Sequence, residues 1–144
     1  MILFCDTSAL IKLYAQERHS DWMREQANRA SHCIVSQIAW VELCAALGHK
    51  EKMGQVQALV AKTVLARLRA EWGMFQQFAL DGGLLHSAGE LALRFSLRAY
   101  DSVQLASAQR AHWHLGNNMA FCCFDKSLND AAQALGIPVL TVKD

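Results

Sequence analysis

Short apolar runs alternate with amphipathic stretches along the whole chain. Met1–Cys5 and Met119–Phe124 are apolar at nearly every position, which is typical of strands buried on both faces of a parallel sheet. Cys33–Ser36, Met74–Leu80 and Ile137–Val142 are three further short runs that we expect to be strands. The chain therefore predicts up to five short strands.

The stretches between these strands repeat apolar residues at helical spacing, as Val56, Val60 and Val64 do. We expect helices over Ala9–Ala15, Ser20–Ala30, Gln37–Leu47, Gln55–Trp72, Leu84–Leu97, Tyr100–His114 and Ser127–Leu135. The polar segment Gly48–Gly54 is expected to break the third helix. Strands that alternate with helices predict right-handed βαβ units. The expected fold is α/β, with helices on both faces of a mainly parallel sheet of four to five strands.

The composition fits one domain over residues 1–144. Apolar residues make up 53% of the chain and charged residues 19%, below the roughly 25% that is usual in globular domains. Such a chain either has an extensive core or covers an apolar surface with a partner. The net charge of +1 does not indicate a generally nucleic-acid-binding surface, so any such contact needs a local basic patch.

The five cysteines are odd in number and lie in apolar runs, which indicates reduced core thiols rather than a disulfide framework. Scattered histidines and the absence of a C-x-x-C motif argue against zinc. The first residues enter a strand with no basic leader, and no apolar run reaches the length of a membrane span. We therefore expect a cytoplasmic protein with no membrane association.

Two of the predicted strands are followed by an aspartate, namely Asp6 and Asp125. Ligands of open parallel sheets bind beyond the carboxyl ends of the strands, so both carboxylates are expected at one rim. Helix capping is the structural alternative for each. Thr7, Ser8 and Ser127 are themselves good capping residues, so neither aspartate is expected to be needed for that purpose. Position alone leaves structure and function equally open.

Two further acids extend this pattern. Glu42 interrupts an apolar segment and Asp101 begins a helix, although a surface glutamate and an acid in a first helical turn have ordinary structural explanations. Four carboxylates brought together repel one another and resist ionisation, and a hard dication relieves that repulsion. An oxygen-only ligand set favours Mg²⁺ or Mn²⁺, and such a site suits phosphodiester hydrolysis.

Four segments containing these acids resemble the PIN domain, and among its branches they are most similar to VapC-type toxins of bacterial toxin–antitoxin systems. The segments are Asp6–Tyr14, Val41–Leu43, Leu97–Ala106 and Phe124–Leu128. They occur in the family's order and extend over essentially the whole chain. The resemblance implies a three-layer α/β fold and a Mg²⁺-dependent endoribonuclease, with Mn²⁺ as a possible substitute.

The resemblance also implies roles for individual residues. Asp6 and Asp101 would be the main metal ligands, and Glu42 and Asp125 would complete the cluster directly or through water. A metal-activated water would attack the RNA phosphate in line. Ser8 would hold a water or a phosphate near the first acid.

Basic residues near these segments are candidates for contacts with RNA phosphates. Lys12 lies one helical turn beyond Ser8, and Lys126 follows Asp125 directly. Arg98 and Arg110 are further candidates. A solvated surface charge is the alternative for each of them.

The family resemblance implies protein partners as well. A VapB-like antitoxin would lie in an apolar groove near the site. The high apolar fraction and the long helix Gln55–Trp72 fit such a surface and also the homodimer that we expect, although a plain core explains them equally well. A haloacid-dehalogenase-type enzyme is disfavoured because Ser8 occupies the position of its second aspartate, and a receiver domain because Thr7 replaces its second acid. A catalytically silent PIN-like module that acts only by binding a protein partner stays open.

Overall fold

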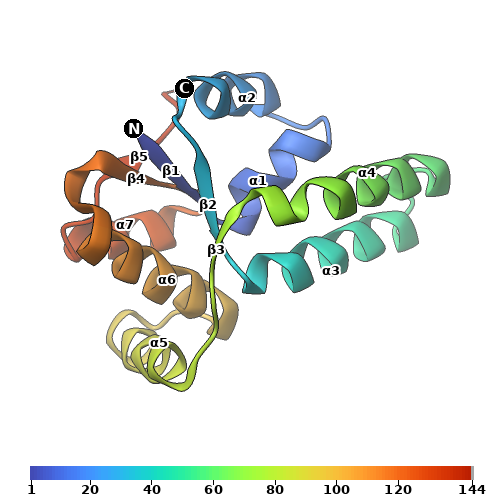
Figure 1. Ribbon diagram of the computed structural model, residues 1–144. Coiled ribbons are helices and arrows are strands. Elements are labelled where there is room, and N and C mark those ends of the chain that lie inside the picture. Colours follow the sequence, from blue (N-terminus) through green and yellow to red (C-terminus); the bar gives the residue numbers. More distant parts are fainter. Residues whose placement is uncertain (144) are drawn as a thin grey trace.

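The computed structural model describes residues 1–143 and contains one parallel sheet in the order β3-β2-β1-β4-β5 (Figure 1). The strands are β1 (Ile2–Cys5), β2 (Cys33–Ser36), β3 (Gln76–Phe78), β4 (Met119–Cys122) and β5 (Val139–Leu140). All four pairings are parallel. The expected α/β fold with a parallel sheet is confirmed, and all five predicted strands form within their predicted ranges.

Seven α-helices connect these strands. They are α1 (Thr7–Tyr14), α2 (Ser20–Arg29), α3 (Ile38–Lys52), α4 (Ala58–Glu71), α5 (Gly82–Phe95), α6 (Ala99–Leu115) and α7 (Lys126–Ala134). Short 3₁₀ turns follow α4 and α6, at Trp72–Met74 and Gly116–Asn118. None of the helices in residues 1–143 is both long and apolar enough to cross a lipid bilayer.

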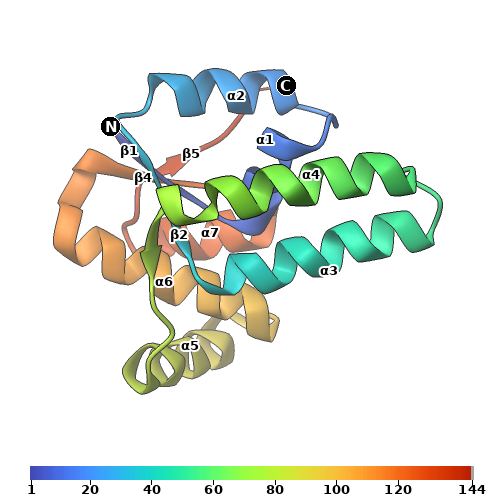
Figure 2. The ribbon, with the colours of Figure 1, turned by 45° about the vertical axis from the view of Figure 1, so that its right-hand side comes forward.

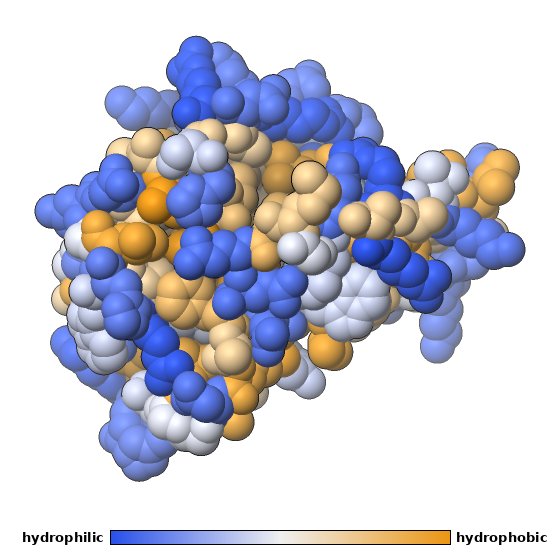
Figure 3. All heavy atoms as spheres, in the orientation of Figure 1, coloured by the Kyte–Doolittle hydropathy of each residue, from blue (hydrophilic) through white to orange (hydrophobic). Residues whose placement is uncertain are grey.

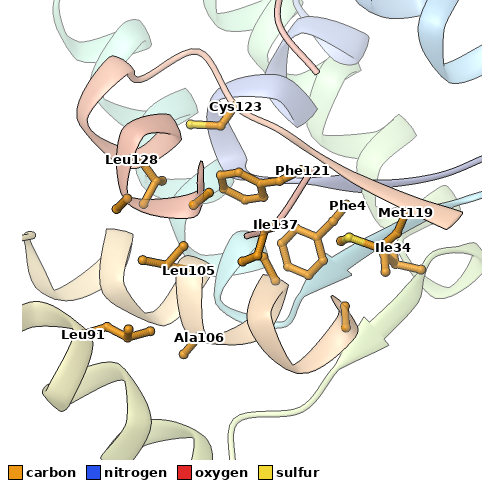
Figure 4. Packing of buried hydrophobic residues seen from close by; sticks show 14 of the residues in the cluster. Phe4, Ile34, Leu91, Leu105, Ala106, Met119, Phe121, Cys123, Leu128 and Ile137 are labelled. Atoms are coloured by element: carbon orange, nitrogen blue, oxygen red, sulfur yellow. The ribbon is translucent and has the colours of Figure 1, made fainter. Parts of the chain in front are cut away.

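Alternating strand residues divide the core into two halves. Phe4 and Phe121 face one side, where they pack with Leu105 of α6 and Leu128 of α7 (Figure 4). The opposite strand faces, which include Cys5, pack against α1, α2, α3 and α4. Because side chains in a strand alternate between its two faces, strands that are apolar throughout require helices on both. The structure therefore has the expected three layers.

The cysteines belong to this interior only in part. All five thiols are free; Cys5, Cys122 and Cys123 are buried, whereas Cys33 and Cys44 are half-buried. The prediction that cysteines lie in the core is confirmed for the three buried residues, and no disulfide links any of the five.

The third helix differs from its prediction because it continues through Gly48 to Lys52. A glycine costs a helix only about 1 kcal/mol, and α3 packs along α4, anchored by the buried Leu47. The chain instead turns at Gly54, whose φ is +70°. The prediction that Gly48–Gly54 interrupts the helix was therefore wrong, and the fourth helix begins at Ala58 rather than Gln55.

The α3–α4 hairpin projects from the rest of the molecule (Figure 2). Apolar residues reach the surface at its outer end (Figure 3). Met53, Leu59 and Val60 are all exposed there, and Leu59 retains 74% of its accessible surface. This tip is an apolar surface that no other part of residues 1–143 covers.

Candidate active site

The two strand-end aspartates lie where each strand passes into a helix. Asp6 follows β1 directly and Asp125 lies three residues beyond the end of β4. β1 and β4 pair with Cys5 opposite Cys122, and the Asp6 amide donates to the Cys122 carbonyl at 3.2 Å. The predicted placement of both residues beyond the carboxyl ends of neighbouring strands is therefore confirmed.

Both aspartates also cap helices, contrary to expectation. The Asp6 Oδ1 accepts a hydrogen bond from the Ala9 amide at 3.0 Å, and the Asp125 Oδ1 accepts one from the Leu128 amide at 2.9 Å. Ser127 lies inside α7 rather than at its cap. Since each helix starts at once after the aspartate, the acid itself occupies the N-cap position that suits its side chain. The prediction that hydroxyl residues would replace the aspartates as caps was wrong.

Asp6 is a buried carboxylate whose hydrogen-bond donors are neutral. It is only 5% exposed, and the Ser8 hydroxyl donates to its Oδ1 at 2.7 Å. Burial raises the pKa of Asp6 to about 6, and the charge of Glu42 adds to this effect, while the hydrogen bonds from Ser8 and Ala9 oppose it. A negative charge at this position is therefore costly without a cation beside it.

Glu42 is held by a polar network that joins three helices. Its Oε1 accepts hydrogen bonds from the Thr7 hydroxyl and from the Gln104 side-chain amide, both at 2.9 Å. The Gln104 amide also donates to the Thr7 hydroxyl at 3.1 Å. This network fixes Glu42 of α3 beside the start of α1 and the first turns of α6.

Gln104 is a site residue that sequence reasoning missed. It is 1% exposed, and its Oε1 has no hydrogen-bond partner among the described atoms. The spacing of Gln104 from Asp101 could have identified it. Residues three positions apart in a helix share a face, and Gln104 lies three positions after Asp101. The buried amide of Gln104 therefore holds Glu42 against the face of α6 that also carries Asp101.

Arg98 brings the other two acids together. Its Nε lies 3.4 Å from the Asp101 Oδ2, and its Nη2 lies 4.0 Å from the Asp125 Oδ2. One guanidinium therefore spans the two carboxylates. The arginine side chain is 84% exposed, so solvent weakens both pairs. Asp101 and Asp125 lie close enough to share one positive charge.

The oxygen-rich donor set at this rim suits Mg²⁺, which commonly takes one or two carboxylates and keeps several waters. Within residues 1–143, no group of three or more His, Cys, Asp or Glu side chains is arranged so that it could hold a metal ion. The buried, unneutralised Asp6 and the cation shared by Asp101 and Asp125 both indicate a rim that requires positive charge. The residues thus fit a partly hydrated dication rather than an ion enclosed by protein.

Ser8 connects the two strand ends. Besides donating to Asp6, its hydroxyl accepts a hydrogen bond from the Phe124 amide at 2.9 Å. Cys123 supports the same turn, because its Sγ accepts from the Asp125 amide at 3.2 Å. Ser8 therefore sets the distance between Asp6 and the segment that carries Asp125, whereas its expected contact with substrate stays a prediction.

Replacing Ser8 with alanine is expected to lower the free energy of unfolding by about 1–2 kcal/mol, because the Phe124 amide loses its partner. Chemical denaturation at neutral pH measures the change. Ser127→Ala is the matched control, since Ser127 is exposed on α7 and its loss is expected to fall within about 0.5 kcal/mol of zero. Equal stability of Ser8→Ala and the wild type would contradict this role.

The two candidate lysines lie along one cleft of about 640 Å³, which Phe124 also lines. Lys12 is largely buried, pairs with Glu17 at 2.9 Å and lies 4.5 Å from the centroid of the Phe124 ring. Lys126 is exposed and pairs with Asp130 at 2.8 Å. Both therefore lie on the side of the site where β4 and β5 end. Their contact with RNA phosphates stays a prediction, as does that of Arg98.

Arg110 lies elsewhere. Its Nη1 forms an ion pair with the Asp81 Oδ2 at 2.8 Å, at the start of α5, where Asp81 is the N-cap. This arginine therefore fastens α5 to α6.

Comparison with known proteins identifies relatives over nearly the whole chain. A family model described as the PIN domain matches residues 3–139. The chain is 32% identical over 138 residues to "Ribonuclease VapC46" of Mycobacterium tuberculosis, covering 96% of this chain and 95% of that protein.

Solved structures share the fold at low sequence identity. FitAcB from Neisseria gonorrhoeae superposes with a TM-score of 0.65 at 14% identity, covering 98% of this chain and 97% of that one. VapBC2 from Rickettsia felis, bound to a DNA fragment from the promoter, superposes with a TM-score of 0.61 at 12% identity. The match covers 90% of this chain and 92% of that one. A toxin–antitoxin complex from Klebsiella pneumoniae superposes with a TM-score of 0.58 at 20% identity, and the match covers 87% of each chain.

Proposed function

Because the chain belongs to the PIN domain family, and within it to the VapC-type proteins, we propose that it is a Mg²⁺-dependent endoribonuclease that acts as the toxin of a toxin–antitoxin pair. The observations that carry this proposal are two pairs of acids at the strand ends. The charge of Glu42, which Gln104 holds, adds to the raised pKa of the buried Asp6, and Arg98 spans Asp101 and Asp125. Mn²⁺ can replace Mg²⁺ in such an oxygen-ligand site.

The four acids divide into two pairs in this proposal. Asp6 and Asp101 are the main metal ligands, and Glu42 and Asp125 complete the site directly or through water. The bound cation would polarise the phosphoryl oxygen and acidify a water molecule. The Oε1 of Glu42 accepts hydrogen bonds from Thr7 and Gln104. These bonds fix the orientation of the carboxylate, which would accept a proton from that water molecule.

Positively charged side chains orient the RNA in this proposal. Arg98, which is mostly exposed beside Asp101 and Asp125, can turn from the carboxylates to an arriving phosphate. Lys12 and Lys126 line the neighbouring cleft and would hold phosphates of the same strand. Ser8 donates to Asp6 and would keep that carboxylate oriented during the reaction.

The second candidate function is a PIN-like binding module without catalysis. The ion pairs of Arg98 favour it, because this arginine already satisfies part of the charge of Asp101 and Asp125. The two candidates differ in whether a divalent cation binds the folded chain.

Titration with Mn²⁺ is expected to stabilise the wild-type chain by about 2.7 kcal/mol when the free ion is at 100 times its dissociation constant. Thermal melting followed by circular dichroism measures the shift. The double variant Asp6→Asn/Asp101→Asn is expected to show little of it, because two carboxylate ligands are lost. A wild-type chain with no metal-dependent shift would favour the binding module.

Protein partners form part of the same proposal. A VapB-like antitoxin would block the acidic rim, and a homodimer would cover apolar surface. The exposed tip of the α3–α4 hairpin, formed by Met53, Leu59 and Val60, supports an apolar contact of this kind. The expected setting is the cytoplasm, where the RNA substrate is found.

A further inference from the structure

A small apolar pocket lies beside the acidic rim, where α3 contacts the start of α6. It has a volume of about 200 Å³ and is lined by Val41, Glu42, Ala45 and Tyr100. Two of these residues contribute large exposed apolar surfaces: Val41 is 56% exposed and Tyr100 is 58% exposed. The pocket therefore presents an aromatic ring and an aliphatic wall directly to solvent.

The residues of this pocket connect it to the proposed chemistry. Tyr100 immediately precedes Asp101, and Glu42 belongs to both the pocket and the acidic rim. A molecule with its reacting phosphate at the acids would thus place its neighbouring group against Tyr100. None of the four lining residues is a lysine or an arginine, and one is a carboxylate. A phosphate is disfavoured here on charge alone, whereas a flat uncharged ring is not.

We propose that this pocket receives one nucleobase of the RNA, stacked on the ring of Tyr100 and bounded by Val41, next to the phosphate that is cleaved. This inference rests on the proposed function and adds a base subsite to it. Aromatic side chains stack on any base because every base has a π-face. The pocket is smaller than the roughly 300–1,000 Å³ of sites for drug-sized ligands, which suits a single base.

The distribution of charge along the rim indicates the path of the bound RNA strand across the site. In the sheet order β3-β2-β1-β4-β5, α3 follows β2, and the cleft lined by Lys12 and Lys126 lies beyond β4 and β5. The apolar pocket and the basic cleft therefore flank Asp6 on opposite sides. One base enters the pocket, and the phosphates on the far side of the cleaved bond follow the lysines.

The test measures binding of a short single-stranded RNA that carries fluorescein at one end and 2-aminopurine in place of one base. Ca²⁺ replaces Mg²⁺, and a gel verifies that the RNA stays intact. Tyr100→Leu is expected to bind about 5- to 150-fold more weakly and to lose the quenching of 2-aminopurine that stacking produces. Tyr100→Phe keeps the ring and is expected to resemble the wild type in both measurements.

Trp113→Leu is the matched control, because it removes an aromatic residue, 68% exposed, from the opposite end of the same helix. It is expected to leave affinity and quenching unchanged. Equal affinity and quenching in wild type and Tyr100→Leu would overturn the base subsite and leave the pocket for a protein partner. A loss as large in Tyr100→Phe or in Trp113→Leu would also overturn it, as would a wild type that binds no RNA.

Failure of the proposed function has a different signature. A wild type that quenches 2-aminopurine through Tyr100 but cleaves no RNA in Mg²⁺ would overturn the nuclease alone. Cleavage that depends on Asp6 and Asp101, together with an unaffected Tyr100→Leu, would overturn the subsite alone.

Discussion

Asp101→Asn is expected to lower Mg²⁺-dependent cleavage of structured RNA by about 1,000-fold or more. Asparagine keeps the size of the side chain and one oxygen but removes the negative charge that would hold the dication. A bound metal stabilises the transition state by several kcal/mol, and each 1.36 kcal/mol corresponds to a factor of ten in rate. Initial rates on a labelled RNA, with protein and Mg²⁺ in excess, measure the loss.

Asp21→Asn is the matched control for this experiment. It makes the same chemical change at an exposed aspartate of α2 whose partner is Arg24. Asp21 does not line the basic cleft of Lys12 and Lys126, so the variant is expected to retain wild-type activity. Inhibition by EDTA does not replace these variants, because contaminating nucleases also need metal ions. Equal activity in the wild type and Asp101→Asn would refute the proposed mechanism.

Asp6→Asn is expected to lose activity to a similar extent and yet to stabilise the metal-free protein. Burial raises the pKa of Asp6 from 3.8 to about 6, so at pH 7 the folded chain holds an ionised carboxylate at a cost. Two pKa units correspond to about 3 kcal/mol as an upper limit. The amide retains an acceptor for Ser8 and Ala9, so we expect a gain of about 1–2 kcal/mol in the free energy of unfolding. Urea denaturation in EDTA measures it.

The gain has a defined pH dependence. Between pH 3.8 and about 6 the folded wild-type chain binds a proton at Asp6 that the unfolded chain has released. The stability that this group contributes therefore rises as the pH falls through that window. The advantage of Asp6→Asn is expected to be largest at pH 7 and to disappear near pH 4. An asparagine variant that is less stable than the wild type in EDTA at pH 7 would contradict the cost of the buried charge.

Adding Mn²⁺ separates the two effects of Asp6. A bound ion would neutralise the carboxylate of the wild type, whereas the amide of the asparagine variant carries no charge to attract it. The difference in stability between the two proteins is therefore expected to shrink or reverse with the metal. Such a trade between activity and stability is common where a site holds costly charge.

The local pattern of the chain was enough to predict the strands and the layers. Runs such as Met119–Phe124 are apolar on both faces, so only a sheet covered on both sides can bury them. The same pattern placed Asp6 and Asp125 at the carboxyl ends of their strands. The extent of α3 was not predictable, because the small cost of Gly48 is outweighed by packing against α4, a contact that the local sequence does not contain.

The capping roles of the aspartates were misjudged for a similar reason. Thr7, Ser8 and Ser127 have capping side chains, but the residue at which a strand turns into a helix is set by where the sheet ends. That junction lies at Asp6 and at Asp125. Each aspartate therefore caps a helix at the same position from which it would act in the proposed site.

The sequence by itself determined the fold class and the strand ends, and it was enough to propose the four acids, because periodicity and residue type are local properties. Only the tertiary structure decided how the acids are held. Gln104 reaches Glu42 across 62 positions, Arg98 spans Asp101 and Asp125, and packing removes Asp6 from solvent. The pocket of Val41 and Tyr100 likewise exists only where α3 meets α6. Such contacts depend on how distant segments pack, and no spacing along the chain encodes them.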